Sequence, residues 1–187
     1  MTALFITAAG TDVGKTFVAA GLIRLLRQRG GEIDAIKPVV SGFNSARAGD
    51  SDCGVLLRAL GLPLSEEEIE DISPWRFAAP LSPDMAARHE GKEIDFEQLV
   101  SFCETAIEEA EGHMLVEGVG GVMVPLDQTN TVLDWIATTR NPSSSSSFDA
   151  ATASPAAPII TGTTGLSANG RLTARVNARA FCNGKAA

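Results

Sequence analysis

The tripeptide Gly14-Lys15-Thr16 has the clearest chemical potential in this sequence. A run of small residues precedes it, and a stretch with helically spaced apolar residues begins at Lys15. At a helix start, backbone N–H groups attract phosphate, a lysine reaches the outer phosphates and a threonine hydroxyl binds Mg²⁺. Ala9 stands where the strict phosphate-loop pattern has its first glycine. The preceding strand-like run and the following helical stretch nevertheless predict a nucleotide-binding loop.

Two carboxylates are candidates to complete a magnesium site with Thr16. Asp52 lies at a predicted helix start, where the ordinary explanation of an aspartate is a cap. Glu117 ends an apolar run and is followed by a glycine-rich stretch. A glutamate there is commonly solvated, but burying it beside a sheet is costly unless a positive group meets it. Glu117 is therefore the stronger candidate.

Lys37 and Ser41 form a third group, within the segment Lys37-Pro38-Val39-Val40-Ser41-Gly42. This segment follows an apolar run, which predicts that it lies at the end of a strand. Lys37 is positioned to neutralise a carboxylate or a phosphoryl oxygen, with Ser41 as a hydrogen-bonding neighbour. The alternative for Lys37 is a solvated surface charge.

Alternating apolar runs and helical periodicities predict the elements that position these residues. Strands are expected at 3–7, 33–40 and 114–116. Helices are expected at 15–29 and 51–60, in a short acidic segment capped by Ser65, from Pro83 to near Gly91, and after the N-cap Asp95. Alternation of strands and helices predicts an α/β fold with a parallel sheet covered on both faces and ligands at the carboxyl ends of the strands.

Composition limits the function classes. The chain has 187 residues, 44% of them apolar, and a net charge of −8, which suits one domain or one domain with an appendage. No apolar run approaches the roughly 18 to 20 residues of a membrane helix, and the acidic balance argues against nucleic acid as a partner. Three cysteines without a CxxC pattern argue against a zinc site or disulfide framework. The N-terminus does not resemble a secretory signal, so a cytoplasmic location is expected.

The charge is unevenly distributed along the chain. Residues 1–140 carry −11, whereas 141–187 carry +3 and open with a serine run. The second part has no sustained period of 2 or 3.6 residues. We therefore expect a nucleotide-binding domain at 1–140 and a low-complexity or frame-shifted segment at 141–187.

Several separated motifs together resemble one enzyme family. They are Gly10 to Thr16, Ile36 to Gly42, Ser51-Asp52, Pro80-Leu81-Ser82-Pro83, Glu90-Gly91, Leu115 to Gly121 and Pro125-Leu126. In this order and spacing, residues 1–140 resemble the dethiobiotin synthetases. The resemblance implies a P-loop NTPase-like α/β fold, a homodimer, and an ATP-dependent ligase that closes a ureido ring from 7,8-diaminononanoate and CO₂.

The same resemblance implies roles for individual residues. Lys15 would stabilise the transferring phosphoryl group, with Asp12, Val13, Gly14 and Thr16 around the nucleotide phosphates. Thr16, Asp52 and Glu117 would hold Mg²⁺. Lys37, Thr11 and Ser41 would surround a substrate carbamate, and Gly118, Val119 and Gly120 would line the substrate pocket by close backbone approach.

The sequence departs from the family pattern at two places. Ala8 and Ala9 replace a glycine and a threonine found in many members. After Asp134-Trp135-Ile136, the family's apolar strand and later adenine-recognising segments are not legible. A reading-frame shift near Arg140 in a GC-rich gene explains a serine run, because GTC valine codons read one base along become TCG. A genuine low-complexity tail is the alternative.

The sequence bears differently on three other functions. A cobyrinate-type amidotransferase requires a glutamine-hydrolysing domain, for which this chain has no room. A deviant P-loop switch ATPase usually carries an additional early lysine, and none precedes Lys15. The third is a nucleotide-binding but inactive incomplete synthetase.

Overall fold

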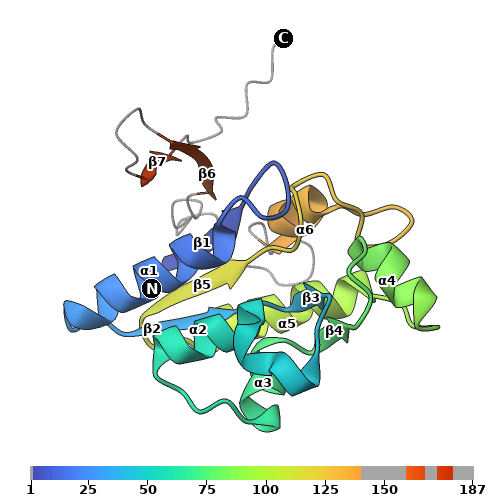
Figure 1. Cartoon of the computed structure of the whole chain (residues 1–187), viewed down its shortest axis with the longest axis horizontal. Coiled ribbons are helices and arrows are strands. Elements are labelled where there is room, and N and C mark those ends of the chain that lie inside the picture. Colours follow the sequence, from blue (N-terminus) through green and yellow to red (C-terminus); the bar gives the residue numbers. More distant parts are fainter. Residues whose placement is uncertain (1, 140–158, 167–171, 179–187) are drawn as a thin grey trace, which may run out of the picture.

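A computed structural model of the chain describes residues 2–139, 159–166 and 172–178 (Figure 1). Five strands form the main sheet in the order β2-β5-β1-β6-β7. Their bounds are Thr2–Thr7 (β1), Ile33–Ile36 (β2), His113–Glu117 (β5), Ile159–Leu166 (β6) and Leu172–Ala178 (β7). All neighbours run parallel except β6 and β7. The predicted α/β fold with a parallel sheet is confirmed, and its strand order brings the ends of β1 and β5 together.

Six α-helices and one 3-10 helix lie within the described residues. Their bounds are Lys15–Gln28 (α1), Ser45–Asp50 (η1), Asp52–Leu60 (α2), Glu66–Ile72 (α3), Pro83–His89 (α4), Phe96–Glu109 (α5) and Val132–Thr139 (α6). Two predicted caps are present: the side chain of Ser65 accepts from the Glu68 N–H and that of Asp95 from the Gln98 N–H. These bonds satisfy N–H groups that a helix start leaves without an intrahelical partner.

Helices cover both faces of the sheet. Helices α1 and α2 pack on one another, and α5 packs on α6 behind β5 (Figure 1). Phe5 of β1 lies edge-on against Trp135 of α6, with ring centroids 6.1 Å apart. Both rings are fully buried. This packing explains why β1 and β5 are continuous apolar runs: both faces of each strand are covered.

The prediction of a single strand at 33–40 is wrong, because the structure has two shorter strands there. The chain leaves the main sheet after Ile36 and enters a separate two-stranded sheet as β3 (Val39–Ser41), which pairs with β4 (Trp75–Phe77). Pro38 has no N–H to donate to a ladder, and the Lys37 N–H donates instead to the Ile72 carbonyl, 2.9 Å away. The break sets Lys37 at the junction of two sheets.

Part of the segment 141–187 lies within the described residues. There β6 pairs with β1 in parallel, with Phe5 opposite Ile159, and β7 pairs with β6 in antiparallel. The serine run lies outside the described residues. The division at residue 140 therefore stays a prediction. Across the described chain, no helix has the length and apolar character needed to cross a membrane.

Candidate active site

The phosphate loop joins β1 to α1 at the carboxyl edge of the sheet. Two of its residues have left-handed backbones, Asp12 with φ 56° and Gly14 with φ 91°. Gly14 is the N-cap of α1 and supplies no side-chain oxygen to the first N–H groups. Those N–H groups, at the positive end of a 14-residue helix, are consequently available to an anion.

A second loop packs directly on the phosphate loop. The Val122 N–H donates to the Ala8 carbonyl at 2.8 Å. A Cβ added to Gly121 would lie 2.6 Å from the Ala9 carbonyl oxygen, closer than any such contact in real proteins. Only glycine at position 121 therefore allows the second loop to pack this closely on the phosphate loop. Ala8 and Ala9, the departures from the family pattern, lie at this contact.

Thr16, Asp52, Glu117 and Lys37 meet at the base of the site. The Thr16 hydroxyl lies 2.9 Å from Asp52 Oδ1 and 2.6 Å from Glu117 Oε1. The ammonium of Lys37 lies 2.7 Å from Glu117 Oε1 and 2.9 Å from Asp52 Oδ2. These residues come from α1, α2, β5 and the β2–β3 junction, so the tertiary structure assembles them.

Lys37 is fully engaged by the protein. Its Nζ also donates to the Gly118 carbonyl at 3.2 Å, so its three ammonium hydrogens have three acceptors. Lys37 and Glu117 are 2% and 0% exposed. The solvated alternatives for both side chains are therefore wrong, and the positive partner that a buried Glu117 requires is Lys37.

The oxygens of this cluster fit a divalent cation. The single hydrogen of the Thr16 hydroxyl cannot serve both nearby carboxylates at once. Glu117 Oε2 is buried and has no hydrogen-bond partner. Negative oxygens thus exceed donors here, and carboxylate and hydroxyl oxygens are ligands that Mg²⁺ prefers. The donor set of Thr16, Asp52 and Glu117 therefore fits Mg²⁺, and these are the residues that would hold it.

Burial and charge act against each other in the cluster. Burial disfavours the charged form of Lys37, but Glu117 and Asp52 outweigh it and raise the pKa of Lys37. Burial also opposes ionisation of Asp52, yet Lys37 and Thr16 hold the pKa of Asp52 below its ordinary value. For Lys15, burial and then the charge of Lys37 lower the pKa. Its Nζ donates to the Gly10 carbonyl at 3.0 Å, turned toward the phosphate loop.

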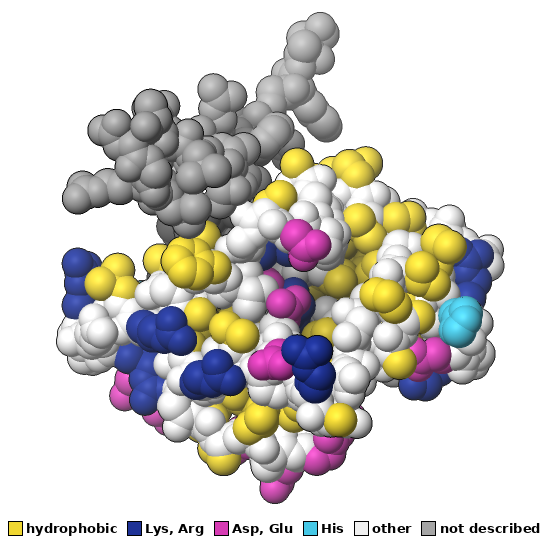
Figure 2. Space-filling model, in the orientation of Figure 1, with side chains coloured by type: hydrophobic (Ala, Val, Ile, Leu, Met, Phe, Trp, Pro, Cys, Tyr) yellow, Lys and Arg dark blue, Asp and Glu magenta, His cyan; other side chains and the backbone are white. Residues whose placement is uncertain are grey.

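A cavity of about 910 Å³ opens above these residues. Figure 2 shows the molecule hollowed near its middle, where acidic and basic side chains meet, with hydrophobic side chains on the side toward α4. The polar wall includes Lys15, Thr16, Lys37 and Asp52, whereas Leu81 and Val124 contribute to the apolar wall. Ser41 also faces the cavity, and its buried Oγ has no hydrogen-bond partner. The cavity can hold a molecule with an apolar body and a charged end.

The other predicted residues divide into two groups. Lining the same cavity are Thr11, Asp12, Gly14, Val119 and Gly120. Val13 and Gly118 do not line it, although the Gly118 carbonyl binds Lys37. The sequence analysis counted residues 80–83 among the family motifs but gave them no role in the site, and it missed Val124. The pair Pro80 and Pro83 was a usable signal, because it follows a short strand and fixes a rigid loop at the same sheet edge as Ser41.

A family model described as an AAA domain matches residues 2–142. The chain belongs to this family of AAA domains. The matched range contains every candidate site residue and ends near the predicted boundary at residue 140.

Named relatives of this AAA domain are synthetases. It is 54% identical over 138 residues to the ATP-dependent dethiobiotin synthetase BioD of Acidiphilium cryptum (strain JF-5), a match covering 73% of this chain and 62% of that protein. It is 46% identical over 147 residues to the protein of that name from Methylobacterium nodulans (strain LMG 21967 / CNCM I-2342 / ORS 2060), covering 76% and 65%. The chain spans about three fifths of the length of the relatives it matches.

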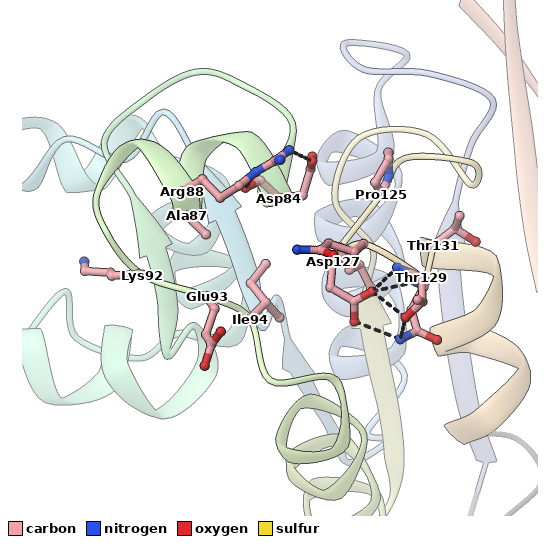
Figure 3. Close-up of a pocket in the computed structure, with 13 residues that line it drawn as sticks. Asp84, Ala87, Arg88, Lys92, Glu93, Ile94, Pro125, Asp127, Thr129 and Thr131 are labelled. Atoms are coloured by element: carbon pink, nitrogen blue, oxygen red, sulfur yellow. Dashed lines mark hydrogen bonds and ion pairs between the residues drawn. The ribbon is translucent and has the colours of Figure 1, made fainter.

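The AAA domain has a second cavity, of about 540 Å³, between α4 and the loop 125–131 (Figure 3). Several of its polar groups bind one another: Arg88 pairs with Asp84, and Asp127 accepts hydrogen bonds from Thr129 and Asn130. Its floor includes Ala87 and Ile94, which are small or apolar. The predicted site residues Lys15, Thr16, Lys37 and Asp52 line the larger cavity and not this one.

Proposed function

We propose that the chain is an ATP-dependent ligase that makes dethiobiotin from 7,8-diaminononanoate, CO₂ and ATP. The observation that carries the proposal is the meeting of Lys37, Glu117, Asp52 and Thr16 beneath a phosphate loop. The chain is also 54% identical, over 138 residues, to a named synthetase. The cavity agrees with such a substrate, because it joins an apolar wall to a charged base.

The proposed reaction has three steps. One substrate amine attacks CO₂ and gives a carbamate with loss of a proton. A carbamate oxygen then attacks the γ-phosphorus of ATP, which releases ADP and leaves a carbamic-phosphoric anhydride. Finally the second amine attacks the carbonyl carbon and loses a proton, the ureido ring closes and phosphate leaves. The carbamate, the ATP phosphates and the leaving phosphate are all anionic. Positioning these groups and neutralising their charge are therefore the main requirements.

The phosphate loop would receive the nucleotide. Asp12, Val13 and Gly14 would surround its phosphates through the loop backbone, and Lys15 would turn from Gly10 to the transferring phosphoryl group. Thr16, Asp52 and Glu117 would hold Mg²⁺, which neutralises phosphate oxygens when bound. The unpartnered Oε2 of Glu117 supports this assignment.

Lys37, Thr11 and Ser41 would surround the carbamate. Ser41 has an unpartnered hydroxyl to offer. Lys37 has no free hydrogen while it binds Glu117, Asp52 and Gly118. It would therefore exchange one of these acceptors for the substrate, and we expect that acceptor to be Asp52, which is more exposed than Glu117. Gly118, Val119 and Gly120 would lie along the substrate chain.

The proposal includes a cytoplasmic homodimer with no nucleic-acid or membrane partner. Exposed apolar side chains near the cavity, Leu81, Met85 and Met123, support an interface on this side. The net charge of −8 opposes binding to nucleic acid.

The deciding experiment measures incorporation of labelled bicarbonate into dethiobiotin with ATP and diaminononanoate. Incorporation that requires both compounds supports the proposal. ATP binding without product would instead indicate an inactive incomplete synthetase. ATP hydrolysis that depends on a protein partner and yields no product would indicate a switch ATPase. Lys15→Ala or Lys37→Ala with near wild-type turnover would refute the corresponding residue role.

A further inference from the structure

The backbone around Lys37 is held by a segment that the proposed reaction does not use. Residues 37 and 38 lie between β2 and β3, outside both strands, so other residues must satisfy most of their peptide groups. The Lys37 N–H donates to the Ile72 carbonyl at 2.9 Å, and the Trp75 N–H donates to the Pro38 carbonyl at 3.0 Å. The remaining group, the Lys37 carbonyl, accepts from the Ser73 hydroxyl at 2.7 Å.

Ser73 is itself held firmly. Its side chain is fully buried. Its N–H donates to the Ile69 carbonyl at the end of α3, and its carbonyl accepts from Arg76 Nη1 at 2.7 Å. Arg76 in turn pairs with Glu66 and Glu70 of α3. The hydroxyl thus has a fixed position from which to orient the Lys37 peptide.

The direction of that peptide decides where the ammonium lies. Lys37 is 2% exposed and its Nζ binds three acceptors at 2.7, 2.9 and 3.2 Å, so small changes in its Cα position disturb all three contacts. We propose that Ser73 is a positioning residue, which fixes the Lys37 backbone and thereby the placement of its ammonium between Glu117 and Asp52. This inference rests on the proposed role of Lys37 in the reaction.

The test compares Ser73→Ala with Ser65→Ala. Ser65 caps the other end of α3, where its side chain accepts from the Glu68 N–H, so this control removes a hydroxyl from the opposite end of the same helix. We expect Ser73→Ala to lower kcat by about tenfold to a hundredfold, the effect of a displacement on the order of 1 Å, with the KM for ATP within about twofold of wild type. Ser73→Cys, which keeps a weak donor of similar size, should recover part of kcat. Equal kcat for the two alanine variants would overturn the proposal.

A second measurement reads the Lys37 position without turnover. Titration with Mn²⁺ alone, in the absence of nucleotide, reports how strongly the ammonium competes for Glu117 and Asp52. A loosened Lys37 competes less, so Ser73→Ala should bind Mn²⁺ several-fold more tightly than wild type and Ser65→Ala should not. Unchanged Mn²⁺ affinity in Ser73→Ala would refute the positioning role even if the wild-type chain formed no dethiobiotin, an outcome that would refute the proposed function separately.

Discussion

The ammonium of Lys37 lies 2.7 Å from Glu117 Oε1, and both side chains are buried beneath the phosphate loop. Glu117 is also a proposed ligand of Mg²⁺. If that proposal holds, the same carboxylate has two cationic partners, the Lys37 ammonium and a metal ion bound from solution. Because Lys37 binds both proposed carboxylate ligands, it partly neutralises their negative charge in the absence of metal.

We predict that Lys37→Met abolishes turnover and strengthens metal binding. Without the ammonium, Glu117 is buried and unpaired, so the free energy of unfolding should fall by about 3 to 5 kcal/mol in metal-free buffer. Mn²⁺ should bind at least tenfold more tightly than to wild type. At about a hundred times its Kd it should restore roughly 2.7 kcal/mol. Thermal melting with and without Mn²⁺ measures both effects.

Lys15→Met is the matched control for that variant. It makes the same change of charge within the same cavity, but Lys15 Nζ binds the Gly10 carbonyl and neither carboxylate. It should weaken ATP binding and leave the Mn²⁺-dependent recovery of stability near that of wild type. Equal Mn²⁺ affinities for the two variants would show that long-range charge, and not contact, sets metal binding.

We predict that Glu117→Gln lowers kcat by about a hundredfold or more, since the interactions that neutralise transferring phosphate contribute at least that much. The amide oxygen can still accept from Lys37, so the fold should persist, as circular dichroism can verify. The Mg²⁺ concentration for half-maximal activity should rise. An unchanged Mg²⁺ dependence would remove Glu117 from the metal site.

We predict that Gly121→Ala weakens ATP binding with little unfolding. Its Cβ would lie 2.6 Å from the Ala9 carbonyl oxygen, so the phosphate loop must shift to admit it. An increase in the Kd for ATP of about tenfold corresponds to about 1.4 kcal/mol of lost contact. Gly21→Ala is the control, because nothing lies within 4 Å of its added Cβ in α1. That control should keep ATP affinity and gain up to about 1 kcal/mol of stability.

We predict that Cys103 lowers the free energy of unfolding as the pH rises into the alkaline range. Burial raises the pKa of the Cys103 thiol from 9.0 to about 12 in the folded chain. As pH rises, the thiol ionises in the unfolded chain before it does so in the folded chain. The free energy of unfolding is therefore unaffected below about pH 9 and falls by about 1.4 kcal/mol per pH unit between there and about pH 12. Denaturant unfolding of wild type and Cys103→Ala across this range tests it. If the two slopes coincide, the thiol does not titrate as its burial requires.

Local patterns were sufficient to predict most elements of the matched domain. The helix caps at Ser65 and Asp95 and the apolar runs of β1 and β5 follow from short-range chemistry, and the structure has them where they are expected. The prediction of one continuous strand at 33–40 was wrong, because Lys37 and Pro38 hydrogen-bond with residues 72–75, which lie far along the chain. Strands as short as β3 and β4 have too few residues to show a period.

By itself the sequence determined the chemical inventory: a phosphate loop, two lysines, a threonine and two carboxylates, each at the end of a predicted element. Only the tertiary structure decided that Lys37 and Glu117 are buried partners and that Ser73 holds the peptide of Lys37. The physical reason is that residues 16, 37, 52 and 117 lie on different elements. Their distances depend on the order of strands in the sheet, which periodicity does not encode.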